Sequence, residues 1–113
     1  MTRKHSNFKA AAVLLAAAIS ATSAYAESSH HGSEQMKKSM DSGMQGMHKM
    51  PMSGDIDKDF AMMMKMHHQQ ALSMSKTELE HGKSPELKAM ASKMIEDQSK
   101  EIEQLDVWLK KNK

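Results

Sequence analysis

The sequence predicts an all-α protein whose central unit is an antiparallel helical hairpin. Apolar residues recur at spacings of three and four in two segments, 55–80 and 85–110, and Gly82 and Ser84-Pro85 supply the stop and start signals between them. A lone hairpin leaves half of each apolar face in contact with water. We therefore expect two copies to form a four-helix bundle as a homodimer.

Residues 1–26 have the three parts of a secretion signal in the expected order. Arg3, Lys4 and Lys9 give a positive start, the run 10–19 is apolar, and Ala24-Tyr25-Ala26 is typical of a cleavage site. An apolar run of this length is too short to span a bilayer. We expect a cleaved signal peptide, export to the periplasm and no membrane span in the mature chain.

The composition restricts the chemistry that the chain can perform. It has 14 methionines and no cysteine. Disulfides, thiolate zinc sites and iron–sulfur clusters are excluded, so His, Met and carboxylates remain as metal ligands. The signal supplies the excess of basic residues, so the mature chain gives no electrostatic indication of nucleic-acid binding. No nucleophile with a neighbouring base can be inferred, so we do not expect an enzyme.

The segment 27–54 is rich in Ser, Gly, His, Lys and Met and has no Val, Leu, Ile or Phe. Because it lacks residues to anchor a core, we expect a largely disordered tail. Its methionines have no core to fill, which favours a role as metal ligands. The candidate ligands in this tail are Met44, Met47, His48, Met50 and Met52.

The segment 55–80 begins with Asp55, Asp57 and Asp59, which are candidates for capping a helix. The predicted apolar face then carries Phe60, Met63, Met64, His67, Ala71 and Met74. Together with His68, this face forms a band of thioethers and imidazoles. The candidate ligands in the band are His67, His68, Met63, Met64 and Met74. Methionine at helical spacing is also typical of core filler, and this alternative remains open.

The second predicted helix has an apolar stripe of Leu87, Ala91, Met94, Gln98, Ile102, Leu105 and Leu109. Gln98 is the polar member of this stripe, and a buried amide needs hydrogen-bond partners. Its amide either forms a hydrogen bond that orients the ring of His67 or His68, without binding the metal itself, or forms a hydrogen bond to the second copy in the dimer. The remaining charged residues, such as Lys93 and Asp97, are expected to form solvated faces.

Thioether and imidazole ligands point to copper. Thioethers suit Cu(I) and, by extension, Ag(I), while imidazole also accepts Cu(II). The sequence therefore predicts a periplasmic copper-binding protein for sequestration, tolerance or delivery, with a periplasmic copper-handling protein as a candidate partner. The alternative is a non-catalytic interaction or structural protein whose methionines are core filler or oxidation sinks.

The string from Asp59 to Met74, with His67-His68-Gln69 at its centre, resembles the DUF305 family of exported, ferritin-like helical proteins. The similarity continues through His81-Gly82, Pro85-Glu86-Leu87 and Trp108-Leu109, so it covers about 55–110. The resemblance implies a helical-bundle fold and copper or silver binding by His67, His68, Met63, Met64 and Met74. Other members carry the helical pair twice in one chain, whereas this chain carries it once.

Overall fold

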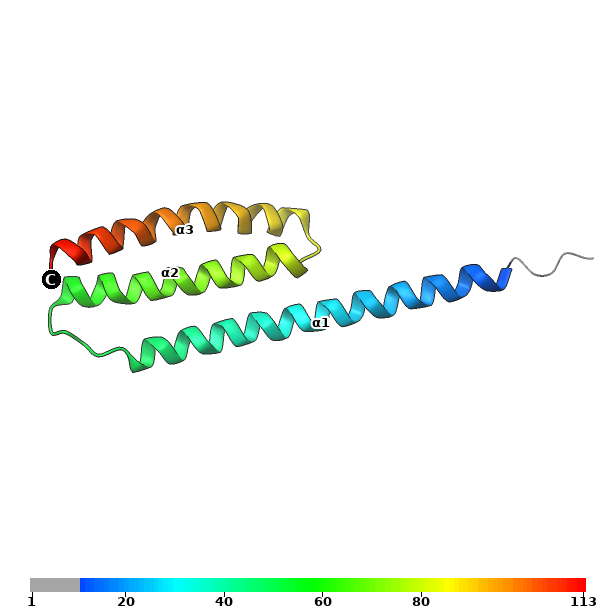
Figure 1. Cartoon of the computed structure of the whole chain (residues 1–113), viewed down its shortest axis with the longest axis horizontal. Coiled ribbons are helices and arrows are strands. Elements are labelled where there is room, and N and C mark those ends of the chain that lie inside the picture. The colour runs from blue at the N-terminus through cyan, green and yellow to red at the C-terminus, as the bar shows by residue number, and fades with distance from the viewer. Residues whose placement is uncertain (1–10) are drawn as a thin grey trace, which may run out of the picture.

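The computed structural model describes the backbone of residues 11–113 and the side chains of Ala24 and residues 26–113. This part of the chain forms three helices, α1 (Ala11–Lys49), α2 (Ile56–His81) and α3 (Pro85–Lys111), and no strand (Figure 1). The predicted all-α class and the helical hairpin are confirmed. The positive start of the predicted signal peptide lies outside the described residues. No helix in the described part is long and apolar enough to cross a membrane.

The hairpin of α2 and α3 has the predicted caps. The carboxylate of Asp55 accepts hydrogen bonds from the backbone N–H groups of Asp57 at 3.0 Å and Lys58 at 3.2 Å, which closes the start of α2. At its end, the N–H of Gly82 donates to the carbonyl of Glu78 at 2.7 Å. The hydroxyl of Ser84 then accepts from the N–H of Leu87, with proline in the first turn of α3. Local capping chemistry therefore determines both hairpin boundaries.

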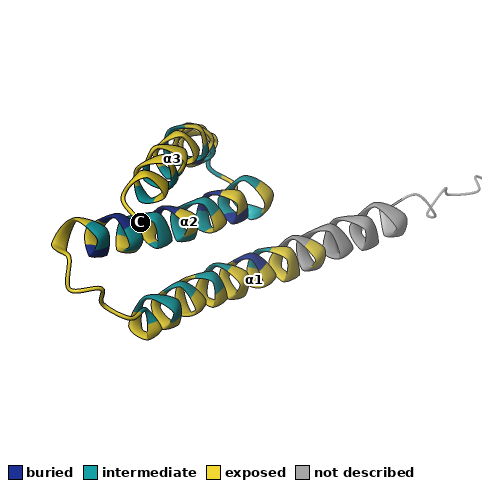
Figure 2. Cartoon of the chain, turned by 60° about the vertical axis from the view of Figure 1, so that its left-hand side comes forward, coloured by how far each residue is buried: buried dark blue, intermediate teal, exposed yellow. Residues whose placement is uncertain are grey.

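The three helices form a single layer rather than a bundle. α2 lies in the middle, with α1 on one side and α3 on the other, and α1 does not contact α3 (Figure 1). Ala61 and Ala91 are the only buried apolar residues among those described (Figure 2). One chain therefore has almost no core of its own.

The expectation that 27–54 is a disordered tail is wrong for residues 27–49, which belong to α1. This part of α1 packs against α2 through small residues instead of large apolar ones. A Cβ atom added at Gly32 would lie 2.5 Å from Cβ of His81, and one added at Gly43 would lie 2.6 Å from Cδ of Gln70. The close approach permits polar contacts, including Gln70 Nε2 to the carbonyl of Met40 at 3.2 Å. Backbone proximity and hydrogen bonds thus replace the missing aliphatic side chains.

The α1–α2 loop is held by Asp59, which is buried rather than serving as the helix cap. Its carboxylate accepts a hydrogen bond from the backbone N–H of Ser53 at 2.7 Å. This bond, with further hydrogen bonds from the Ser53 hydroxyl and the Gly54 N–H, holds the pKa of Asp59 below its ordinary value of 3.8. Gly54 itself has a φ of 85°, a left-handed conformation that favours glycine.

The lowered pKa of Asp59 predicts a pH-dependent difference in stability between the wild type and Asp59→Asn. The ionised carboxylate stabilises the folded state fully above pH 3.8, and this contribution is lost as the pH falls through the lowered folded-state pKa. Urea unfolding of both proteins at several pH values measures it. An unfolding free-energy difference that stays constant through the acidic range would contradict the assignment.

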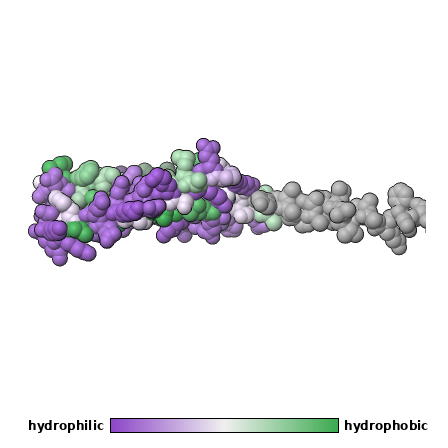
Figure 3. All heavy atoms as spheres, turned by 90° about the horizontal axis from the view of Figure 1, so that it is seen from above, coloured by the Kyte–Doolittle hydropathy of each residue, from purple (hydrophilic) through white to green (hydrophobic). Residues whose placement is uncertain are grey.

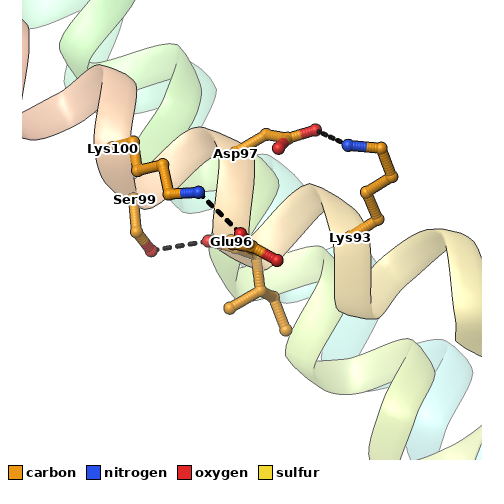
Figure 4. Close-up of polar contacts among 6 residues, drawn as sticks. Lys93, Glu96, Asp97, Ser99 and Lys100 are labelled. Atoms are coloured by element: carbon orange, nitrogen blue, oxygen red, sulfur yellow. Dashed lines mark hydrogen bonds and ion pairs between the residues drawn. The ribbon is translucent and has the colours of Figure 1, made fainter.

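The outer surface of α3 is solvated, as expected. Lys93 pairs with Asp97 at 2.7 Å and Lys100 with Glu96 at 2.6 Å, both one helical turn apart (Figure 4). Their hydrogen bonds raise the pKa of each lysine and lower that of Glu96. Figure 3, which looks onto the molecule from the α3 side, shows mostly hydrophilic residues with hydrophobic ones in separate patches. Such exposed pairs contribute little stability.

Candidate metal centre

His68 is the histidine that the α2–α3 packing buries, with 7% of its surface exposed. Its Nε2 atom lies 2.5 Å from a carboxylate oxygen of Glu101 on α3. A carboxylate can only accept a hydrogen bond, so Nε2 carries the proton in this pair. The neutral tautomer then leaves a lone pair on Nδ1, the other ring nitrogen.

Nδ1 of His68 is buried and has no hydrogen-bond partner, and the same is true of the side-chain carbonyl oxygen of Gln98 on α3. Buried polar atoms without partners are rare, and each needs an explanation. A histidine that ligates a metal usually donates its other ring N–H to a carboxylate, which is the arrangement of His68 and Glu101. The free nitrogen therefore has the chemistry of a prepared metal ligand.

Methionines occur on both helices of this pair. Met64 precedes His68 by one helical turn. Further along the α2–α3 seam, the hydroxyl of Ser75 lies 4.0 Å from the sulfur of Met94 on α3. The imidazole of His67 is next to His68, with ring centroids 6.2 Å apart, but it is exposed. The described residues contain no group of three or more His, Cys, Asp or Glu placed to hold a metal, so a site here would need thioethers.

The apolar face predicted for α2 points away from the centres of both neighbouring helices, and its residues are exposed or half-buried. Residues such as Ser73 contact α1, and residues such as His68 contact α3, from nearly opposite sides of α2. At about 100° per residue, the predicted face points between these two directions. Phe60 is 61% exposed and Met63 is 38% exposed. Because α2 has two neighbours, its polar and small positions form the contacts.

We call this uncovered side the open face. Phe60 shares a shallow cavity with Leu105 and Trp108, which places these α3 residues on the same side. Lys38 and Ser42 of α1 line a groove with Gln69 on the side of the molecule opposite the open face. At about 100° per residue, Met40 and Met44 then lie on the side of α1 that belongs to the open face. The open face comprises Met40 and Met44 of α1; Phe60, Met63, Met64, His67, Ala71 and Met74 of α2; and Leu87, Met90, Met94, Leu105 and Trp108 of α3.

The candidate ligands expected on a tail lie in the last turns of α1 and in the loop after it. Met44, Met47 and His48 are helical, whereas Met50 and Met52 follow the helix. Gly43 lies against Gln70 and Gly46 against Met66, so the end of α1 passes the level of His67 and His68. The structure therefore brings Met44 and Met47 to the central part of α2, while Met52 remains 65% exposed in the loop.

Three residues were not selected by sequence reasoning. Glu101 is the partner of His68, but only the register of α2 against α3 identifies it. Met62 and Met66 line a cavity of about 450 Å³ with Lys65, Gln69 and Leu109, on the side opposite the open face. Their spacing of four residues was visible in the sequence and could have identified a second pair of thioethers.

No curated protein matches the chain. The family described as "Domain of unknown function (DUF305)" matches residues 3–109. This match includes α1 and thus extends beyond the segment 55–110 that carried the resemblance. Because the match covers most of the chain, the protein belongs to the DUF305 family.

Proposed function

We propose that this protein binds Cu(I), or Ag(I) in its place, as cargo, with Nδ1 of His68 as the anchoring ligand. The observation that carries the proposal is the buried imidazole whose Nε2 is occupied by Glu101 and whose Nδ1 has no partner. Met64, which lies one helical turn before His68 on the open-face side of α2, is the first candidate thioether for this site, and Met74 lies on the same side of the helix. Gln98 of α3, whose buried side-chain oxygen also has no partner, is proposed to support these ligands.

The choice of a soft ion rests on the donor atoms. Thioethers favour Cu(I) and Ag(I), whereas hard ions such as Ca²⁺ and Mg²⁺ favour clusters of oxygen ligands. Methionine also serves where cysteine would be oxidised to disulfide, which agrees with the secretion signal predicted for residues 1–26. The proposed role is sequestration, tolerance or delivery of copper in the periplasm, in exchange with a copper-handling partner.

The methionines at the end of α1 form a second part of the proposed function. Met40 and Met44 are 44% and 47% exposed, so their sulfurs are accessible to ions in solution. They lie on the open face with Met63 and His67, and Met47, His48, Met50 and Met52 continue the series at the loop. We infer that this series collects ions for the His68 site, with Cu(II) held through imidazole where it is present.

One observation favours the alternative of an interaction protein without a metal. The open face exposes Phe60, Leu87 and Met90 to 61%, 51% and 56%, and large exposed apolar patches mark binding surfaces. In that case the methionines are adaptable contacts or oxidation sinks. A homodimer through this face, as the hairpin pattern predicts, is compatible with either function.

Glu101→Ala separates the two functions. Removing the carboxylate leaves Nε2 of His68 without its acceptor, so we expect the affinity for Ag(I) to fall about 10- to 100-fold. Native mass spectrometry with Ag(I), Cu(I) and Zn²⁺ in competition measures the affinity and the preference among ions. Glu103→Ala, an exposed change on the same helix, is the matched control and should bind as the wild type does. Equal silver affinities for the wild type and both variants would contradict the metal function.

A further inference from the structure

The open face is an uncovered apolar surface on a molecule that is only one helix thick. Stable domains bury the apolar side of each helix against a second layer, and the described helices provide one layer. No large side chain among those described is fully buried. The described residues therefore leave this surface without a second layer.

A second copy of this chain fits the open face better than a partner of different chemistry. The open-face residues of α2, from Phe60 to Met74, include no charged side chain, and the carboxylate of Glu101 on the same side of α3 is already paired with His68. Partners of unlike sequence are commonly selected by complementary charges, which this strip does not offer. A neutral apolar strip is complementary to itself, and closed two-fold pairing is the commonest assembly of identical chains.

The position of α2 determines which residues would meet in such a pair. α2 is the middle helix of the layer, and His67 lies at the middle of α2. A two-fold axis that runs between the two faces brings residues beside it against their own copies. Centring the faces on each other thus places the exposed His67 against His67 of the second copy, with Met63 one turn away in each chain.

We propose that two copies of this chain pair through the open face and hold one soft metal ion between their His67 side chains. The ligands are the two imidazoles, with the thioethers of the two Met63 residues beside them. This ion is separate from the ions at the two His68 sites. The inference rests on the proposed function for the class of ion, but the pairing and the role of His67 are independent of His68.

Linkage between metal binding and pairing tests the shared site. An ion that binds only the dimer lowers the dimer dissociation constant, and we expect a decrease of roughly tenfold or more when Ag(I) is added. Analytical ultracentrifugation with and without Ag(I) measures this constant. His67→Ala should abolish the silver effect. Lys76→Ala, an exposed position outside the open face, and His68→Leu should both retain it.

Disulfide trapping tests the geometry, because the chain has no cysteine of its own. Ala71→Cys, one turn after His67 on the open face, should form linked dimers under mild oxidation. Lys76→Cys should stay unlinked, since two cysteines must approach within about 7 Å between their Cα atoms to form a disulfide.

The outcomes separate this inference from the proposed function. A wild type that stays monomeric with and without Ag(I), and an Ala71→Cys variant that does not cross-link, would overturn the pairing and assign the open face to a different partner. A dimer dissociation constant that does not change when Ag(I) is added would overturn the proposal of a shared ion. Silver binding that depends on His68 in a monomeric protein would overturn the inference and leave the proposed function supported.

Discussion

Replacing His68 with Leu is expected to remove silver binding at the His68 site, but not the ion shared between the His67 side chains, and to leave the metal-free protein at least nearly as stable as the wild type. Leu is apolar and similar in size, so it fills the α2–α3 seam without a cavity. The change also removes a buried nitrogen that has no hydrogen-bond partner, which is a cost in the folded state. Glu101 is half exposed and can turn to water when its partner is gone.

The expected change in the free energy of unfolding is therefore small, within about 1.5 kcal/mol, and an increase in stability is consistent with the argument. The measurements are urea unfolding of the metal-free protein and silver titration under competition. If His68 served only the core, the same substitution would destabilise the fold and leave silver binding by the other methionines unchanged. A residue that a protein retains at a cost to its stability is typical of a functional site.

The hairpin was predictable because local chemistry determines it. Asp55, Gly82 and Ser84-Pro85 act within one helical turn, so the sequence alone places the ends of α2 and the start of α3 correctly. The face of α2 was not predictable in the same way. Hydrophobic periodicity assumes a single neighbour, whereas α2 has one on each side and contacts both mainly through small and polar residues.

In the candidate site, too, the features that depend on neighbouring residues were predictable, and those that depend on the packing of distant helices were not. His68 and Met64 could be selected from their spacing, but the different environments of His67 and His68 depend on where α3 lies. Glu101 follows His68 by more than thirty positions, and only the antiparallel register, supported by a second ion pair between Lys65 and Asp106, brings them together. The composition of residues 27–49 led to the wrong prediction of a disordered tail. Glycine and serine indicate disorder in an isolated segment, but beside α2 they permit two helices to pack closely.

Two glycine substitutions in α1 are expected to change stability in opposite directions. Alanine at either position favours the helix by about 1 kcal/mol through its higher propensity. At Gly46 the added Cβ would lie 3.0 Å from the terminal methyl carbon of Met66, a flexible group that can move. Gly46→Ala should therefore raise the unfolding free energy slightly.

At Gly32 the added Cβ would lie 2.5 Å from Cβ of His81, an atom fixed to the backbone of α2. The overlap can be relieved only by separating α1 from α2, and overpacking of this kind costs about 1–3 kcal/mol, which exceeds the propensity gain. Gly32→Ala should therefore weaken the docking of α1, expose its amides and break the contact between His81 and Gln35. Hydrogen exchange across residues 27–49 and urea unfolding of both variants measure the two effects. If both substitutions stabilise the protein equally, α1 does not dock closely on α2, and Met44 and Met47 are not held beside His67.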